Sequence, residues 1–270
     1  MRSVVSMRRV QPEHGVDRGR DLVDRRGERL PVVAMAIAGA WLIAVVAQST
    51  GNAALLHHHA LVEGSAPLWV AVPLFLVTWQ VMIVAMMLPA SLPTIRVVEA
   101  ATGMLARPRR ARATFLGAFA VIWTVFGLLA FMGDVVLHHL VDATPWLATR
   151  PWLIEASVVA LAGAYQFAPL KRRELAACRH PASLLPTTAP PRRGFFQLGF
   201  DHGLTCLGSS WALMLLMFAE GFANLWWMVA LTAVMVYETT GRYGRRAASA
   251  VGVLLLLFAA VVLLTGRGAA

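Results

Sequence analysis

Two cysteines and two histidines stand near one another in the second half of the chain. Cys178-Arg179-His180 precedes His202, and Cys206 follows His202 by four positions. Residues four apart lie one turn apart on the same face of a helix, so one ion can bridge His202 and Cys206. Thiolate and imidazole groups are ligands of Zn(II) and Cu(I), although the spacing matches no zinc-finger pattern. The alternatives are a free thiol at Cys178 and simple packing of a small apolar side chain at Cys206.

Methionines in an earlier apolar segment supply further soft ligands. Met82 and Met86 share one helical face with Trp79 in the segment 68–89. Thioether ligands combined with thiolate favour Cu(I) over Zn(II). Pro89, at the end of this segment, frees backbone carbonyls that a cation or a water molecule can use. The alternative is that the methionines only fill gaps in an apolar core.

Polar residues also stand inside apolar segments, namely Gln166, Asp201 and Glu238. Ionisable groups are costly within a membrane and usually face a bundle interior or a watery cavity. We therefore expect Asp201 to face the bundle and to find a polar partner. For Glu238, a role at the site and a position at the membrane interface both stay open. Gly199 and Gly203 form a small-xxx-small pair, which predicts close packing against another helix.

The elements that must position these residues are long apolar segments. Of the 270 residues, 58% are hydrophobic and 14% are charged. A soluble domain is usually ~45–50% apolar and ~25% charged, so the composition excludes an ordinary soluble enzyme and a disordered chain. We predict an all-α fold, a polytopic transmembrane helix bundle with about seven spans. The predicted spans are 30–50, 68–89, 113–137, 152–168, 195–219, 225–239 and 247–265.

The basic residues predict the orientation of these spans. All but Arg150 and Arg267 of the 24 Lys and Arg residues fall in the tail 1–29 or in loops on one side. The positive-inside rule places that side in the cytosol, with the N-terminus inside and the C-terminus outside. Charge spread over several loops in this way argues against a nucleic-acid-binding groove. We expect a disordered cytosolic tail over 1–29, a transmembrane domain over 30–267, and no cleaved signal peptide.

Motifs of catalytic chemistry are missing. The chain contains no P-loop and no H-E-x-x-H sequence. The stretch Gly208–Trp211 lacks the second glycine of the G-x-S-x-G motif of serine hydrolases. We therefore do not expect an enzyme. His57–His59 and His138–His139 fall in loops on the predicted outer side, where consecutive histidines can capture a metal, although an ordinary polar loop is slightly favoured.

Together, these stretches resemble a bacterial family of integral membrane proteins described as predicted metal-binding proteins. The resemblance covers residues 68–240 and implies a helical membrane fold and a metal, but no reaction. The chain departs from the family pattern at Glu174, Ser209 and Ser210, where the family often has cysteine. If those cysteines are ligands, only Cys178 and Cys206 remain here. The matching stretches are Trp79–Pro89, Tyr165–Lys171, Cys178–Pro181, Gly203–Gly208, Trp211–Met214 and Asn224–Glu238.

These observations lead to three hypotheses. The first is a protein of the bacterial cytoplasmic (inner) membrane that binds or moves a transition metal, with copper favoured and zinc as the other candidate. The second is a non-catalytic scaffold or assembly subunit in the membrane, whose small residues and methionines only pack. The third, a proton-coupled transporter of small solutes, would use Asp201 and Glu238. The expected partners are the lipid bilayer and the metal. The sequence does not indicate which proteins, if any, bind this chain. The predicted metal ligands are Cys206, His202, Cys178, His180, Met82 and Met86.

Overall fold

A computed structural model describes residues 30–50, 67–102, 107–180, 194–220 and 224–266, and within these ranges it contains helices and no strands. The predicted all-α class is therefore confirmed. The predicted disordered tail 1–29 and the histidines His57–His59 lie outside the described residues. The helices are α2 (Leu30–Ser49), α5 (Leu68–Thr102), α6 (Pro108–Asp142), α7 (Pro145–Ala148), α8 (Pro151–Tyr165), α9 (Pro169–Arg179), α10 (Phe195–Glu220), α11 (Leu225–Thr240) and α12 (Gly244–Thr265).

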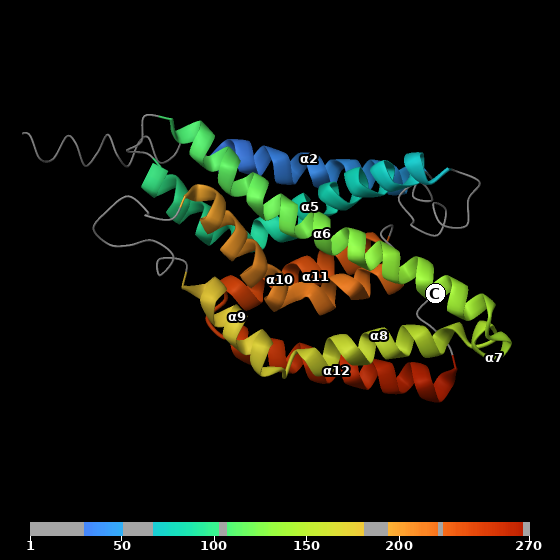
Figure 1. Ribbon diagram of the computed structural model, residues 1–270. Helices are drawn as coiled ribbons and strands as arrows, with labels where there is room; N and C mark the ends of the chain where they lie inside the picture. The colour runs from blue at the N-terminus through green and yellow to red at the C-terminus, as the bar shows by residue number, and fades with distance from the viewer. Residues whose placement is uncertain (1–29, 51–66, 103–106, 181–193, 221–223, 267–270) are drawn as a thin grey trace, which may run out of the picture.

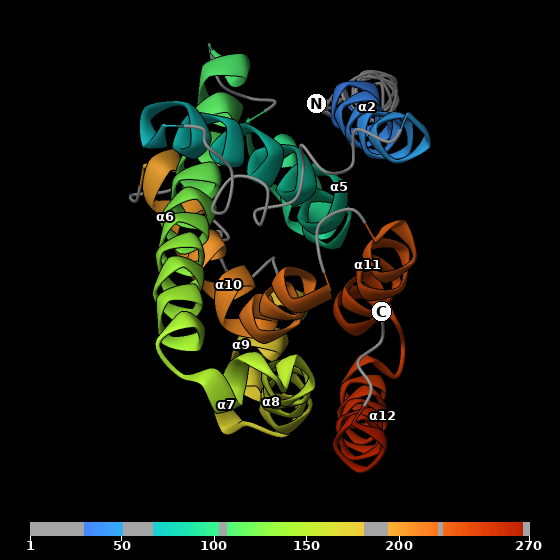
Figure 2. The ribbon, with the colours of Figure 1, turned by 90° about the vertical axis from the view of Figure 1, so that its right-hand side faces the viewer.

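The long helices run side by side along one direction, as Figure 1 shows. Helix α10 is at the centre of the bundle and packs against α6, α8, α9 and α11. Figure 2, turned by 90°, shows α2 at the periphery beside α5, and α12 at the opposite edge beyond α8 and α11. Helix α10 carries both His202 and Cys206, so the predicted ligands of this helix lie in the middle of the fold.

Four helices among the described residues are long and apolar enough to cross a bilayer. They are Pro31–Ser49, Trp69–Thr102, Pro108–Asp142 and Gly244–Thr265, and the pair α8 and α9 adds a fifth span if the two helices count as one across their bend of 62°. Helix α11 has 16 residues and is therefore about 24 Å long, shorter than the ~30 Å hydrocarbon core. The finding is thus four or five candidate spans, and the predicted total of seven stays a prediction.

Two predicted boundaries are wrong. The second predicted span was expected to end at Pro89, but α5 continues through Pro89 and Pro93 to Thr102. Proline removes one backbone hydrogen bond, and a long packed helix can absorb that loss. Residues after Pro169 were expected to form a loop, but they begin α9, whose buried face of Lys171, Leu175 and Cys178 packs against the bundle.

The carbonyl that Pro89 frees is used within the protein. Because proline has no N–H, the carbonyl oxygen of Ala85, four residues earlier, receives no intrahelical hydrogen bond from it. The indole Nε1 of Trp41 in α2 donates to this oxygen over 3.1 Å. A carbonyl freed in this way was expected to be available to a cation or a water molecule. The Ala85 carbonyl instead accepts a hydrogen bond that joins α2 to α5.

Glycines set the distances between α5, α6 and α10. The indole of Trp79 in α5 donates to the carbonyl oxygen of Trp123 over 2.7 Å, and a Cβ on Gly127 would lie only 2.6 Å from that indole nitrogen. On α10, a Cβ on Gly199 would collide with the backbone oxygen of Phe115 in α6. A Cβ on Gly203 would lie 3.0 Å from Ile122 Cγ1 in α6. The close packing predicted for Gly199 and Gly203 is therefore present, and its partner is α6.

Candidate metal centre

A thiol and a thioether meet in the core, where α10 faces α5. The Sγ atom of Cys206 lies 4.0 Å from the Sδ atom of Met87, and the two side chains are 5% and 1% exposed. Sulfur ligands bind a transition ion at about 2.3 Å, so two of them on one ion stand at most ~4.6 Å apart. The observed separation is therefore within the range that two sulfur ligands of a single ion can have.

Three serine hydroxyls surround this sulfur pair. Ser91 Oγ of α5 lies 4.0 Å from Cys206 Sγ, and Ser210 Oγ lies 3.7 Å from Met87 Sδ. Ser209 and Ser210 donate their hydroxyl hydrogens to the carbonyl oxygen of Cys206, over 2.8 and 2.7 Å. All three serines are buried. Their hydroxyls are satisfied locally, which leaves the soft sulfur atoms as the strongest ligands for a metal at this place.

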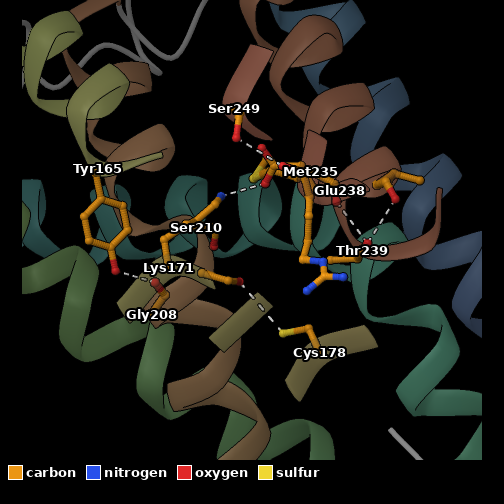
Figure 3. Close-up of polar contacts among 12 residues, drawn as sticks. Tyr165, Lys171, Cys178, Gly208, Ser210, Met235, Glu238, Thr239 and Ser249 are labelled. Atoms are coloured by element: carbon orange, nitrogen blue, oxygen red, sulfur yellow. Dashed lines mark hydrogen bonds and ion pairs between the residues drawn. The ribbon is translucent and has the colours of Figure 1, made fainter. Parts of the chain in front are cut away.

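The second thiol approaches the same point from α9. Cys178, which Figure 3 labels, is buried, and its Sγ atom lies 3.8 Å from Ser209 Oγ. Helix α9 thus places the thiol of Cys178 against Ser209 of α10, three residues after Cys206, and the predicted sharing of one ion by the two cysteines stays a prediction.

His202 is buried on α10, one turn before Cys206, and lies against α6. Its ring stacks on Phe115 and Phe119, with centroid separations of 5.8 and 5.6 Å. The Nε2 atom is buried and finds no hydrogen-bond partner among the described residues. A buried polar atom without a partner is unusual and marks a place where a ligand or water would be favourable. His202 therefore remains a candidate ligand, although its aromatic contacts are on α6.

The predicted ligand set is not gathered as a whole. Within the described residues, no three His, Cys, Asp or Glu side chains are grouped so that they could hold one metal ion. His180 lies exposed at the end of α9, with its Nδ1 atom 2.9 Å from the carbonyl oxygen of Ala176. It follows Arg179, the last residue of α9, and its backbone angles (φ −122°, ψ 60°) are not helical, so it does not share the buried face that carries Cys178. Met82 and Met86 are buried, but the thioether in contact with Cys206 belongs to Met87.

Glu238 is engaged in a buried ion pair. Its Oε2 atom lies 2.6 Å from Lys171 Nζ, with the two side chains 2% and 1% exposed, while its Oε1 atom is buried without a hydrogen-bond partner in the described part of the chain. Asp201 is partly exposed, and Gln166 is buried with its Oε1 atom unbonded among the described residues. Asp201 belongs to no group of three His, Cys, Asp or Glu side chains that could hold a metal among the described residues.

A surface pocket of about 350 Å³ lies between α6, α9 and α10. It contains no thiol, thioether or imidazole group in its lining, so it lacks the soft ligands that a copper ion requires. The pocket is therefore distinct from the sulfur pair. Its lining residues are Phe126, Leu170, Glu174, Leu204, Leu207, Gly208 and Trp211.

Sequence reasoning missed two residues of this region. Met87 directly follows Met86, and one position turns a helix by about 100°, so the spacing of Met82 and Met86 selected a different face. Met87 stands four residues before Ser91, on the same face of α5, but Ser91 lies beyond the end of the predicted span 68–89. Lys171 was counted among the basic loop residues that set the orientation, and no pattern in the chain indicated its pairing with Glu238.

Comparison with known proteins gives one family. The model of the family PpoB2, described as a copper chaperone, matches residues 76–262. This match includes Met87, Cys178, His202 and Cys206. No curated protein and no solved structure matches the chain.

Proposed function

The chain belongs to the PpoB2 family of copper chaperones, and we propose that it is an integral membrane protein that carries Cu(I) at the contact of Cys206 and Met87. The observation that carries this proposal is the buried thiol–thioether pair. A thiolate and a thioether are soft ligands, which favour Cu(I) over Zn(II), Mg(II) or Ca(II). Cys178 would supply a second thiolate, and His202 is the next candidate ligand. Copper is the cargo in this proposal, and the chain catalyses no conversion of it.

The surface of the bundle supports insertion in a membrane. Large apolar side chains are exposed along the outer helices, among them Leu42 of α2 (62%), Leu129 of α6 (67%) and Leu254 of α12 (65%). Exposed apolar patches of this extent are uncommon on soluble monomers and typical of surfaces that face lipid. We propose the cytoplasmic membrane, with about seven spans, the N-terminus inside and the copper site in the cytosolic half, because the basic loops predict that orientation.

The test is a measurement of copper in the purified protein. The full chain, loaded with Cu(I) under reducing conditions in detergent, should retain about one copper ion per chain. X-ray absorption should show sulfur as the main ligand. The Cys206→Ser variant should lose the copper and keep its helical circular dichroism, because serine differs from cysteine by one atom. The control is Met217→Leu, a change at a buried methionine near the C-terminal end of α10, and this variant should retain copper.

Two outcomes would overturn the proposal. The first is a wild-type protein that retains no copper. The second is a Cys206→Ser variant that retains as much copper as the wild type. Either result would favour the scaffold hypothesis, in which Cys206 and the methionines serve only to pack the helices.

A further inference from the structure

The helix that carries Cys178 is joined to α11 by a buried ion pair. Lys171, in the first turn of α9, pairs with Glu238 of α11 at 2.6 Å, and both side chains are almost fully buried (Figure 3). Removal of two charges from water is so costly that apolar residues of similar volume usually stabilise a fold equally well or better. A buried pair at this position therefore indicates a requirement beyond stability.

A second attachment lies at the other end of α9. The Arg179 guanidinium donates to the carbonyl oxygens of Glu238 and Gly241, over 2.6 and 2.8 Å. These oxygens lie at the C-terminal end of α11, where carbonyls lack intrahelical partners and the helix dipole is negative. Gly244 leaves the necessary space, because a Cβ there would collide with Arg179 Nη1 and with the carbonyl oxygen of Glu238. Helix α9 is thus held at both ends by groups around Glu238.

Cys178 lies near the C-terminal end of α9, next to Arg179 and seven residues after Lys171. Lys171, Leu175 and Cys178 follow one another at spacings of four and three residues, so they share the buried face of α9. The position of Lys171 along α11 therefore sets the position of Cys178 along α10, where its thiol meets Ser209.

We propose that Lys171, Glu238 and Arg179 are positioning residues that hold α9 against the bundle, so that Cys178 supplies the second thiolate to the copper ion at Cys206. Cu(I) with two thiolates carries one net negative charge, with both thiol protons released to solvent. The copper part of this inference rests on the proposed function. The attachment of α9 does not, and it is testable without metal.

The experiment compares thiol reactivity in the copper-free full chain. The Glu238→Gln variant keeps the size of the side chain and removes the charge that holds Lys171. A maleimide reagent should then label Cys178 at least ten times faster than in the wild type, as measured in a Cys206→Ser background. Labelling of Cys206, measured in a Cys178→Ser background, should stay slow. The matched control is Glu99→Gln, which breaks the Arg112–Glu99 ion pair of 3.2 Å between α6 and α5 and should not change the labelling of Cys178.

A second variant covers the possibility that a lone buried lysine unfolds the chain. The double change Lys171→Met with Glu238→Leu removes both charges and keeps the region apolar. It should fold, and it should also expose Cys178 to the reagent. If Cys178 of the double variant stays as protected as in the wild type, the ion pair is not what holds α9, and the inference is overturned. The same conclusion follows if Glu238→Gln leaves the labelling unchanged.

Copper loading separates this inference from the proposed function. The Glu238→Gln variant should bind Cu(I) at least ten times more weakly than the wild type and show one sulfur ligand fewer by X-ray absorption. The Lys171→Met variant should also bind Cu(I) weakly. The conservative variant Lys171→Arg should bind Cu(I) almost as tightly as the wild type, because it keeps the positive charge. If Cys178 becomes reactive in the variants but the wild type binds no copper, the attachment of α9 is supported and the proposed function fails. If copper affinity and sulfur coordination are unchanged although Cys178 is exposed, its role as a copper ligand is refuted.

Discussion

The substitution Met87→Leu tests which methionine binds copper, because the structure points to Met87 and the sequence pattern pointed to Met82 and Met86. Met87 and Met86 are adjacent on α5, and their side chains are 1% and 0% exposed. Exchange of methionine for leucine conserves volume and usually costs less than ~1.5 kcal/mol, so both variants should fold. Only Met87 places its sulfur atom 4.0 Å from the Cys206 thiol. Met87→Leu should therefore weaken copper binding, and Met86→Leu should not.

The expected loss is at least tenfold in the dissociation constant. Removal of even an outer-shell partner commonly lowers metal affinity by about 10–100-fold, and a tenfold change corresponds to about 1.4 kcal/mol. The assay is competition for Cu(I) against a chromophoric chelator of known affinity, with thermal unfolding as the check on folding. Equal affinities for Met87→Leu and the wild type would refute the role of this thioether. Equal losses for both methionines would show that the contact with Cys206 does not define the site.

Three further predictions concern packing, linkage and orientation. Gly199→Ala should lower the free energy of unfolding by about 1–3 kcal/mol in a denaturation assay, because the added Cβ meets the backbone of Phe115. The control Gly117→Ala should be neutral or slightly stabilising, because a Cβ there meets nothing within 4 Å. Equal effects would contradict the tight contact of α10 with α6. Cu(I) at one hundred times its dissociation constant should stabilise the wild type by about 2.7 kcal/mol in calorimetry and leave Cys206→Ser unaffected. A periplasmic reporter fused after Ala270 should be active, and one placed within 169–194 should be silent, while the reverse pattern would invert the orientation.

Local patterns were sufficient for the class of the fold and for the buried face of α10. High apolar content and the length of the segments predicted helices, and the spacing of Gly199, Gly203, Cys206 and Ser210 predicted one face in close contact with neighbours. Such patterns follow from the 3.6-residue period of a single helix, so they can be found within one continuous stretch of sequence. The suspicion of copper also came from residue types alone, because the softness of thiolate and thioether ligands is a property of the side chains.

Contacts between distant segments could not be predicted in this way. Whether Met82, Met86 or Met87 faces Cys206 depends on the rotation of α5, which Trp41 and Trp79 set through bonds to α5 and α6. Neighbouring positions on a helix are separated by a rotation of about 100°. An error of that size in the assumed rotation of α5 about its axis therefore selects Met86 in place of Met87.

What the sequence by itself determined is the set of available ligands and the helices that carry them. What the tertiary structure alone decided is which of them meet: Met87 with Cys206, Cys178 beside Ser209, and Lys171 with Glu238. The physical reason is that helical periodicity is a local property of the chain, whereas the rotation and depth of one helix against another depend on packing of all the surrounding side chains at once. His180 illustrates the difference, because it stands two positions from the buried Cys178 in sequence and yet lies exposed just beyond the end of α9.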